Sequence, residues 1–281
     1  MENIISVLTK SKNILKKNNI PSASLDCELL LSSSLNISRE HLFMNHTQKI
    51  NEVQLKEFYN LLDRRKKKEP IAYILNKKEF WNNSFYVNKN VLIPRPDTEI
   101  LIEQVLKNFS KNDTISVLDI GTGSGCIVLS LLKLFKNFKG VAIDISKNAL
   151  NVAKYNAKIH LLDNRVKFYK SSVDNFFKGK YDLVVSNPPY INNKSLKYLD
   201  EGIFKYEPNV ALEGGDDGLS LITKVILKSS KLLKKGGKLI LEIGCDQKYK
   251  VKMLLKSEKY YVNKIIYDYA KNPRCVISTK L

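Results

Sequence analysis

The chain is poor in the residues that build metal sites and disulfide frameworks. Its 281 residues include only four cysteines and three histidines. No CxxC pair occurs, and no histidine lies at metal-ligand spacing from a cysteine. We therefore expect no metal and no disulfide, and we expect buried thiols at the four cysteine positions, which are Cys27, Cys126, Cys245 and Cys275.

Long apolar runs are also missing. Although 43% of the residues are hydrophobic, no stretch approaches the roughly 18 uninterrupted apolar residues of a membrane span. The first residues, Met1-Glu2-Asn3-Ile4-Ile5, lack the pattern of a signal peptide. We expect a monomer located in the cytoplasm, with no membrane partner.

Arginine is scarce although the chain is strongly basic. Of 47 basic residues only six are Arg, and the formal net charge is +19. Surfaces that read bases or clamp phosphates usually use arginine forks, whereas diffuse lysine is typical of a solvated surface. The one concentrated basic run, 64–68, ends a helical pattern, where cations complement the helix dipole. We expect no specific nucleic-acid partner.

The chain divides into three regions of different pattern. Apolar residues at helical spacing fill residues 1–69 and predict a small helical bundle. Residues 70–93 alternate apolar and polar residues around Asn-rich turns, as in a β-hairpin that links two domains. From residue 94 to residue 281 strands and helices alternate, which predicts an α/β fold with a doubly wound, mostly parallel sheet. Its seven expected strands are 116–120, 140–144, 166–169, 181–186, 238–243, 261–267 and 274–278.

A proline-rich turn, Ile93-Pro94-Arg95-Pro96-Asp97-Thr98-Glu99, separates the hairpin from the first helix of the third region. Asp and Thr are common N-cap residues, so Asp97 or Thr98 is expected to cap the helix that follows, Ile100 to Phe109.

A glycine-rich loop follows the first strand. Gly121-Thr122-Gly123-Ser124-Gly125 opens a helix, and glycine allows positive φ and close approach of the backbone to a ligand. Taken alone the pattern is weak, since a tight turn or a dinucleotide loop also uses it. Asp144 ends the second strand, where a carboxylate can accept both hydroxyls of a ribose.

Asn187-Pro188-Pro189-Tyr190 follows the fourth strand. Two consecutive prolines cannot continue a strand, so the loop is stiff. It holds an amide, with two donors and one acceptor, beside an aromatic ring at the carboxyl end of a strand. That pairing suits a flat substrate with an NH2 group, although a simple strand-ending turn explains the same residues.

The whole chain resembles the release factor glutamine methyltransferases, the HemK/PrmC family. The resemblance rests on the Ile93–Glu99 turn, the Gly121–Gly125 loop and the Asn187–Tyr190 tetrapeptide, and on three further segments. These are Tyr206-Glu207-Pro208, the stretch from Ala211-Leu212-Glu213-Gly214-Gly215-Asp216-Asp217-Gly218-Leu219, and Asp268-Tyr269-Ala270-Lys271-Asn272-Pro273-Arg274. It implies a Rossmann-like class I methyltransferase fold with a helical substrate-recognition domain at the N-terminus.

The resemblance also implies a cofactor and its ligands. Gly121, Thr122, Gly123, Ser124 and Gly125 would wrap the methionine end of S-adenosyl-L-methionine, and Asp144 would hold its ribose. Ser172 and Val173 would flank the adenine, although many relatives have an acidic and then a bulky residue there. A second departure is Asn76, where glycine is expected in the hairpin; Asn tolerates positive φ better than most residues.

The implied substrate is the glutamine of the Gly-Gly-Gln motif in class I peptide chain release factors. Asn187 and the backbone carbonyl of Pro188 would accept its N–H groups, Tyr190 would pack on its amide plane, and Pro189 would complete the substrate site. Asn187 would border the cofactor as well. Two alternatives stay open, an adenine amino-methyltransferase that acts on DNA or RNA and a non-catalytic binding module.

Overall fold

The computed structural model describes residues 2–281, and these form two compact units. The first unit is the chain up to Asn76 together with Asp200–Tyr206, and the second is Lys77–Leu199 together with Glu207–Leu281. The boundaries predicted above, at residues 69 and 93, stay a prediction.

Short helices build the first unit, as the apolar spacing predicts. They are α1 (Ile4–Lys17), α2 (Ala23–Leu35), α3 (Arg39–Met44), α4 (Glu52–Lys66), α5 (Ile71–Ile74) and α9 (Glu201–Tyr206). The side chains of Asn3, Ser38 and Asn51 accept the backbone N–H groups that begin α1, α3 and α4. Apolar side chains from α1, α2 and α4 then form one core.

The arginines of the basic run at the end of α4 form ion pairs within this unit. Arg65 Nε donates to Asp26 Oδ2 on α2 at 2.6 Å, and the Asp26 side chain is 3% exposed. Arg64 forms a fork with both carboxylate oxygens of Glu69. Because these guanidinium groups are paired, the run is a structural feature of the bundle rather than a free cationic surface.

A seven-stranded sheet organises the second unit and confirms the predicted fold. Its strands are β3 (Ser116–Ile120), β4 (Lys139–Asp144), β5 (Val166–Lys170), β6 (Tyr181–Ser186), β7 (Leu233–Glu242), β8 (Tyr260–Tyr267) and β9 (Pro273–Lys280). The strand order is β5-β4-β3-β6-β7-β9-β8. The pairings from β5 to β7 are parallel, and β9 runs antiparallel to both of its neighbours.

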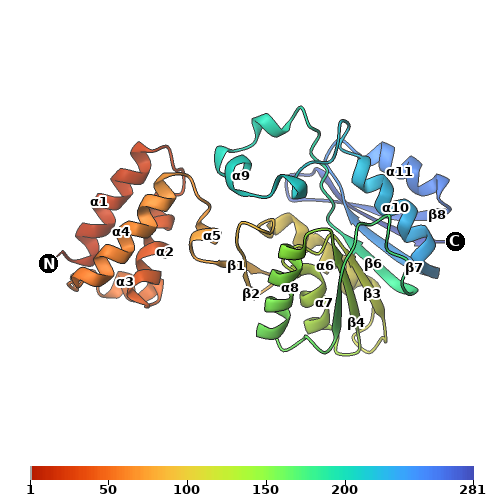
Figure 1. The fold of residues 1–281 in the computed structure, drawn as a ribbon, viewed down its shortest axis with the longest axis horizontal. Coiled ribbons are helices and arrows are strands. Elements are labelled where there is room, and N and C mark those ends of the chain that lie inside the picture. The colour runs from red at the N-terminus through yellow and green to blue at the C-terminus, as the bar shows by residue number, and fades with distance from the viewer. Residues whose placement is uncertain (1) are drawn as a thin grey trace. The chain divides into compact units, whose positions relative to one another are not determined.

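Helices cover both faces of this sheet (Figure 1). One core joins α6 (Glu99–Asn108), α7 (Cys126–Leu134) and α8 (Lys147–Ile159) to one face of the strands, and a second joins α10 (Ser220–Leu232) and α11 (Lys248–Ser257) to the other. Three 3-10 turns complete the unit, at Pro96–Thr98, Leu196–Tyr198 and Asn209–Ala211. Neighbouring residues of β6 alternate between the cores, as a strand buried on both faces requires.

The hairpin is shorter than predicted. Residues Ile71–Ile74 form α5 and not a strand, because Pro70 starts a helical turn. Ile74 of this turn packs into the core of the first unit. The strands are β1 (Lys77–Phe80) and β2 (Asn83–Tyr86), and their antiparallel pair belongs to the second unit. Asn76 adopts φ +52°, so it does support the left-handed turn as expected.

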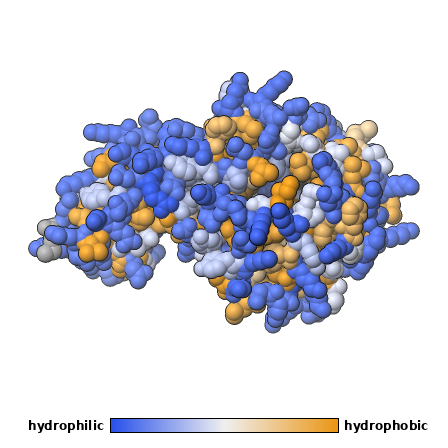
Figure 2. Space-filling model, viewed as in Figure 1, coloured by the Kyte–Doolittle hydropathy of each residue, from blue (hydrophilic) through white to orange (hydrophobic). Residues whose placement is uncertain are grey.

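On the face that Figure 2 shows, the surface is mainly hydrophilic, with hydrophobic residues in small separate groups. This distribution fits the interpretation of the surplus lysine as solvated surface. Cys27, Cys126 and Cys275 are buried as predicted, whereas the prediction for Cys245 is wrong because it lies exposed just after β7. In residues 2–281 no helix is long and apolar enough to cross a membrane.

Asn156 on α8 ties the hairpin to the glycine-rich loop. Its side chain is fully buried. Its Oδ1 accepts the backbone N–H of Tyr86, and its Nδ2 donates to the carbonyls of Tyr86 and Ser124. One side chain thus satisfies three backbone groups that are shielded from water.

Replacement of this side chain should therefore destabilise the second unit. Asn156→Ala leaves the Tyr86 N–H and two carbonyls without partners, which should cost about 2–4 kcal/mol. The thermal unfolding midpoint checks this, with Asn151→Ala, at an exposed position of the same helix, as control. Equal midpoints for the two variants would contradict it.

Candidate active site

The register of three parallel strands brings the predicted site residues to one edge. Ile120 of β3 pairs with Ile143 of β4 and with Ser186 of β6. Since these residues are level, the residues that follow them leave the sheet side by side. They are Gly121, Asp144 and Asn187, which the sequence analysis had assigned to three separate motifs.

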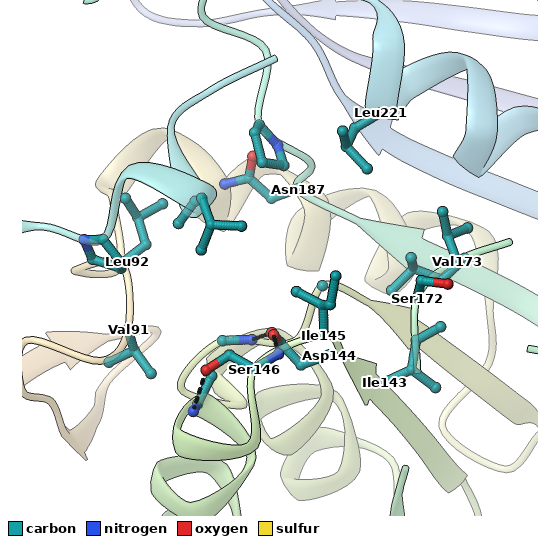
Figure 3. A pocket seen from close by; sticks show the side chains of 18 of the residues that line it. Val91, Leu92, Ile143, Asp144, Ile145, Ser146, Ser172, Val173, Asn187 and Leu221 are labelled. Carbon is teal, nitrogen blue, oxygen red and sulfur yellow. Dashed lines mark hydrogen bonds between the residues drawn. The ribbon is translucent and has the colours of Figure 1, made fainter. Parts of the chain in front are cut away.

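A cavity of about 340 Å³ opens at this edge (Figure 3). Its volume is within the usual range for a small-molecule site. Asn187 lies on one wall, Asp144 and Ser146 on the opposite wall, and Ser172 and Val173 at one side. The predicted residues that line it are Gly121, Gly123, Asp144, Ser172, Val173, Asn187 and Pro189. The others, Thr122, Ser124, Gly125, Pro188 and Tyr190, are not among the lining residues.

The glycines of the loop have two different roles. Gly121, Gly123 and Gly125 all have positive φ, of +74°, +55° and +82°. A Cβ on Gly121 or Gly123 would meet no atom within 4 Å, so both face open space in the cavity. A Cβ on Gly125 would lie 3.0 Å from Leu129 Cδ1. Gly125 therefore serves the packing of α7, and the first two glycines leave room for a ligand.

Asp144 is fixed by backbone donors. Its Oδ2 accepts the N–H of Gly123, and its Oδ1 accepts the N–H of Ser146, each at 2.9 Å. Desolvation raises the pKa of this carboxyl, and the backbone hydrogen bonds oppose that rise. Each oxygen keeps a second lone pair for a hydroxyl in the cavity.

Asn187 is held from behind by Thr98. Asn187 Nδ2 donates to Thr98 Oγ1 at 3.0 Å. The predicted capping role is wrong for both Asp97 and Thr98, because a 3-10 turn, Pro96–Thr98, precedes α6 and neither side chain caps it. Their side chains reach across the sheet edge instead.

Tyr190 points its hydroxyl away from the cavity. The hydroxyl lies 3.4 Å from Glu242 Oε1 and 3.3 Å from Arg274 Nη1. Burial and the neighbouring Glu242 carboxylate raise the pKa of Tyr190 to about 12, so the phenol stays protonated. The predicted contact of its ring with a substrate amide stays a prediction.

The Ile93–Glu99 turn contacts three of the other segments that carried the family resemblance. Glu207, 4% exposed, accepts from Arg95 and from the N–H of Ile93. Asp97 Oδ2 lies 3.4 Å from Arg274 Nε, and Thr98 accepts from Asn187. The turn therefore joins segments that are 89 or more residues away in the sequence.

Gly214 and Gly218 let a second loop lie directly on the tetrapeptide. A Cβ on Gly214 would be 2.8 Å from Tyr190 Cα, and one on Gly218 would be 2.4 Å from the Tyr190 carbonyl oxygen. Gln247 fills the remaining space and donates to the carbonyls of Tyr190 and Gly218. These glycines are required by close backbone approach.

The sequence analysis missed three buried polar residues behind the site: Asp119, Glu242 and Gln247. Asp119 Oδ2 accepts the hydroxyl of Thr122 at 2.7 Å and so fixes the glycine-rich loop. Both acids lie at the carboxyl ends of buried strands, β3 and β7. Both acids could have been found in the sequence, because each is a carboxylate in an otherwise apolar strand.

Comparison with known proteins assigns the chain to a family. Residues 6–75 match the PrmC N-terminal domain, and residues 96–215 match the methyltransferase small domain. A release factor glutamine methyltransferase of Clostridium acetobutylicum is 39% identical over 280 residues, which are 99% of this chain and 98% of that protein. The chain belongs to the release factor glutamine methyltransferase family.

Other comparisons agree with this family. The release factor glutamine methyltransferase of Buchnera aphidicola from Acyrthosiphon pisum is 38% identical, with 96% of each chain covered. A bifunctional methyltransferase of Rickettsia felis is 35% identical over 98% of this chain but only 57% of its own length. A solved methyltransferase of Pyrococcus furiosus shares the fold, with a TM-score of 0.55 at 22% identity over 79% of this chain and 98% of that one.

The buried Glu242 should make the stability of this family member depend on pH. Burial raises the pKa of Glu242 from its ordinary value of 4.5 to about 7. An acid that binds its proton more tightly when folded makes the folded state less stable as the pH rises through that window. Glu242→Gln should remove the part of this dependence that comes from Glu242, worth at most on the order of 3 kcal/mol. The part from Asp119, whose pKa burial also raises to about 7, should remain.

Chemical denaturation at pH 5 and pH 8 measures this difference. The variant should gain stability relative to the wild type at the higher pH. A constant difference between the two proteins at both pH values would contradict the raised pKa of Glu242.

Proposed function

We propose that this protein transfers a methyl group from S-adenosyl-L-methionine to the side-chain nitrogen of the glutamine in the Gly-Gly-Gln motif of class I peptide chain release factors. One observation carries the proposal. In a chain related over its full length to release factor glutamine methyltransferases, the Asn187 amide lies on the wall of the cavity that Gly121 and Asp144 also line.

The residues present fit the cofactor. Gly121 and Gly123 offer open backbone where its methionine end would lie. The fixed carboxylate of Asp144 offers a lone pair on each oxygen to the ribose hydroxyls. Ser172 and Val173 line the cavity at the end of β5 and would flank the adenine. When bound, the cofactor supplies a methyl group already activated on a sulfonium.

The chain's own residues then have to position a poor nucleophile. The nitrogen of a glutamine amide is weakly nucleophilic because its lone pair is delocalised into the carbonyl. Asn187 Oδ1 and the Pro188 carbonyl accept its two N–H groups, which holds the nitrogen and favours its pyramidal form. Pro189 and Tyr190 stiffen the loop that carries this acceptor pair and exclude water from it. In-line positioning supplies most of the acceleration.

No strong base is needed before the attack. Once the nitrogen has gained the methyl group it is cationic and acidic, so its extra proton leaves afterwards, by way of solvent. The acids with raised pKa, Asp119 and Glu242, are fully buried behind the cavity. Their positions fit structural roles rather than proton transfer with the substrate.

A protein substrate calls for a recognition surface beyond the cavity. We assign this to the N-terminal helical unit, whose residues 6–75 match the PrmC N-terminal domain. Its α3 exposes Phe43 and Met44 to solvent at 57% and 72%. Every residue proposed to act in the chemistry comes from the second unit of one chain, so a monomer suffices. A release factor as substrate places the reaction in the cytoplasm.

Transfer of labelled methyl groups tests the proposal. The protein is incubated with radiolabelled S-adenosyl-L-methionine and, separately, with a class I release factor, its Gln-to-Ala variant in the Gly-Gly-Gln motif, and DNA or RNA. Label on the wild-type release factor alone supports the proposal. Label on nucleic acid alone would support the adenine alternative, and cofactor binding without any transfer would support a binding module.

Asn187→Ala should separate transfer from cofactor binding. The variant loses one of two acceptors for the glutamine, so methyl transfer should fall at least about a hundredfold, while the dissociation constant of the cofactor changes by less than about threefold. Single-turnover transfer and calorimetry measure these quantities. Asn137→Ala, at an exposed position, is the control, and loss of cofactor binding in a folded Asn187→Ala protein would contradict the role.

A further inference from the structure

Thr98 stands at a position where its type usually caps a helix, yet it does not cap. It precedes α6 as the N-cap residue, and its side chain makes no capping hydrogen bond. The residue is only 2% exposed. Its hydroxyl instead accepts a hydrogen bond from Asn187 Nδ2 at 3.0 Å. A helix that gives up its cap loses about 1 kcal/mol, so the alternative contact needs a reason.

The second neighbour of this hydroxyl is a buried acid. The Thr98 hydroxyl is the hydrogen-bonding group that most lowers the pKa of Glu242 against the effect of burial. Glu242 Oε2 is buried and has no hydrogen-bond partner among residues 2–281, so it is an open acceptor for the Thr98 hydroxyl proton. A hydroxyl has one proton to donate. A proton that Thr98 turns toward this open acceptor leaves the Thr98 oxygen with lone pairs alone for Asn187.

That arrangement decides which way the Asn187 amide faces. An amide presents an NH2 group on one side and a carbonyl oxygen on the other, and either end fits the same space. An oxygen that can only accept selects the NH2 group. The carbonyl oxygen Oδ1 must then face the cavity, where the proposed glutamine needs an acceptor.

We propose that Thr98, backed by Glu242, is a positioning residue that fixes the Asn187 amide with its acceptor oxygen toward the substrate. The inference rests on the proposed function, since the required orientation is that for a substrate with N–H groups. With the opposite orientation two donors would face each other, and the substrate nitrogen would lose one of its two acceptors.

Thr98→Val and Thr98→Ser form a matched pair for the test. Valine keeps the shape and removes the hydroxyl, so kcat for release factor methylation should fall about ten- to a hundredfold. Serine restores the hydroxyl, so its kcat should return to within about threefold of the wild type. Cofactor affinity, measured by calorimetry, should stay within about twofold in both variants. Thr114→Val, at an exposed position, is the control.

A readout independent of turnover follows the Asn187 side chain itself. In nitrogen-15 spectra of the wild-type protein, one Asn187 NH2 proton should exchange slowly with solvent because Thr98 holds it. This protection should disappear in Thr98→Val and return in Thr98→Ser.

Three results would overturn the inference. Thr98→Val could be as active as the wild type, Thr98→Ser could fail to restore kcat, or the Asn187 amide could exchange equally fast in all three proteins. Failure of the proposed function would look different, because the wild-type protein itself would then transfer no methyl group to the release factor.

Discussion

The level ends of three parallel strands are the constraint on which the site depends. Because Ile120 is paired with both Ile143 and Ser186, the residues proposed to carry cofactor and substrate chemistry lie together at one edge of the sheet. A slip of one residue in either pairing would turn Asp144 or Asn187 to the opposite face. The alternation of β6 side chains between two cores opposes such a slip, because it would place buried apolar residues on the wrong side.

At this edge the Ile93–Glu99 turn connects three distant segments of the chain. It is connected to Glu207, Asn187 and Arg274 through three different side chains. The first two contacts are hydrogen bonds with a buried partner, so each is worth more than its exposed equivalent and costs more to break. The third is an ion pair. The site is thus rigid because a short turn, itself stiffened by Pro94 and Pro96, holds segments from distant parts of the sequence.

Much of this could be predicted from the sequence, and the reasons for the failures are physical. Strands and the glycine-rich loop follow from local patterns, since apolar runs and positive-φ glycines are properties of neighbouring residues. Local reasoning also predicted that Thr98 caps a helix, and this prediction is wrong. The Thr98 hydroxyl instead accepts a hydrogen bond from Asn187, which is distant in the sequence. The roles of Glu242 and Gln247 could not be predicted, because Glu242 lies 52 residues from Tyr190 and the two carbonyls to which Gln247 donates lie 29 and 57 residues away.

The proposed function requires the cavity to present an acceptor pair to the amide nitrogen of a release factor glutamine. Tandem mass spectrometry of the release factor, after incubation with this protein and S-adenosyl-L-methionine, tests it most directly. We expect a single added methyl group, located on the side-chain nitrogen of the glutamine in the Gly-Gly-Gln motif. A methyl group on any other residue of the factor, or an unmodified factor beside a methylated nucleic acid, would contradict it.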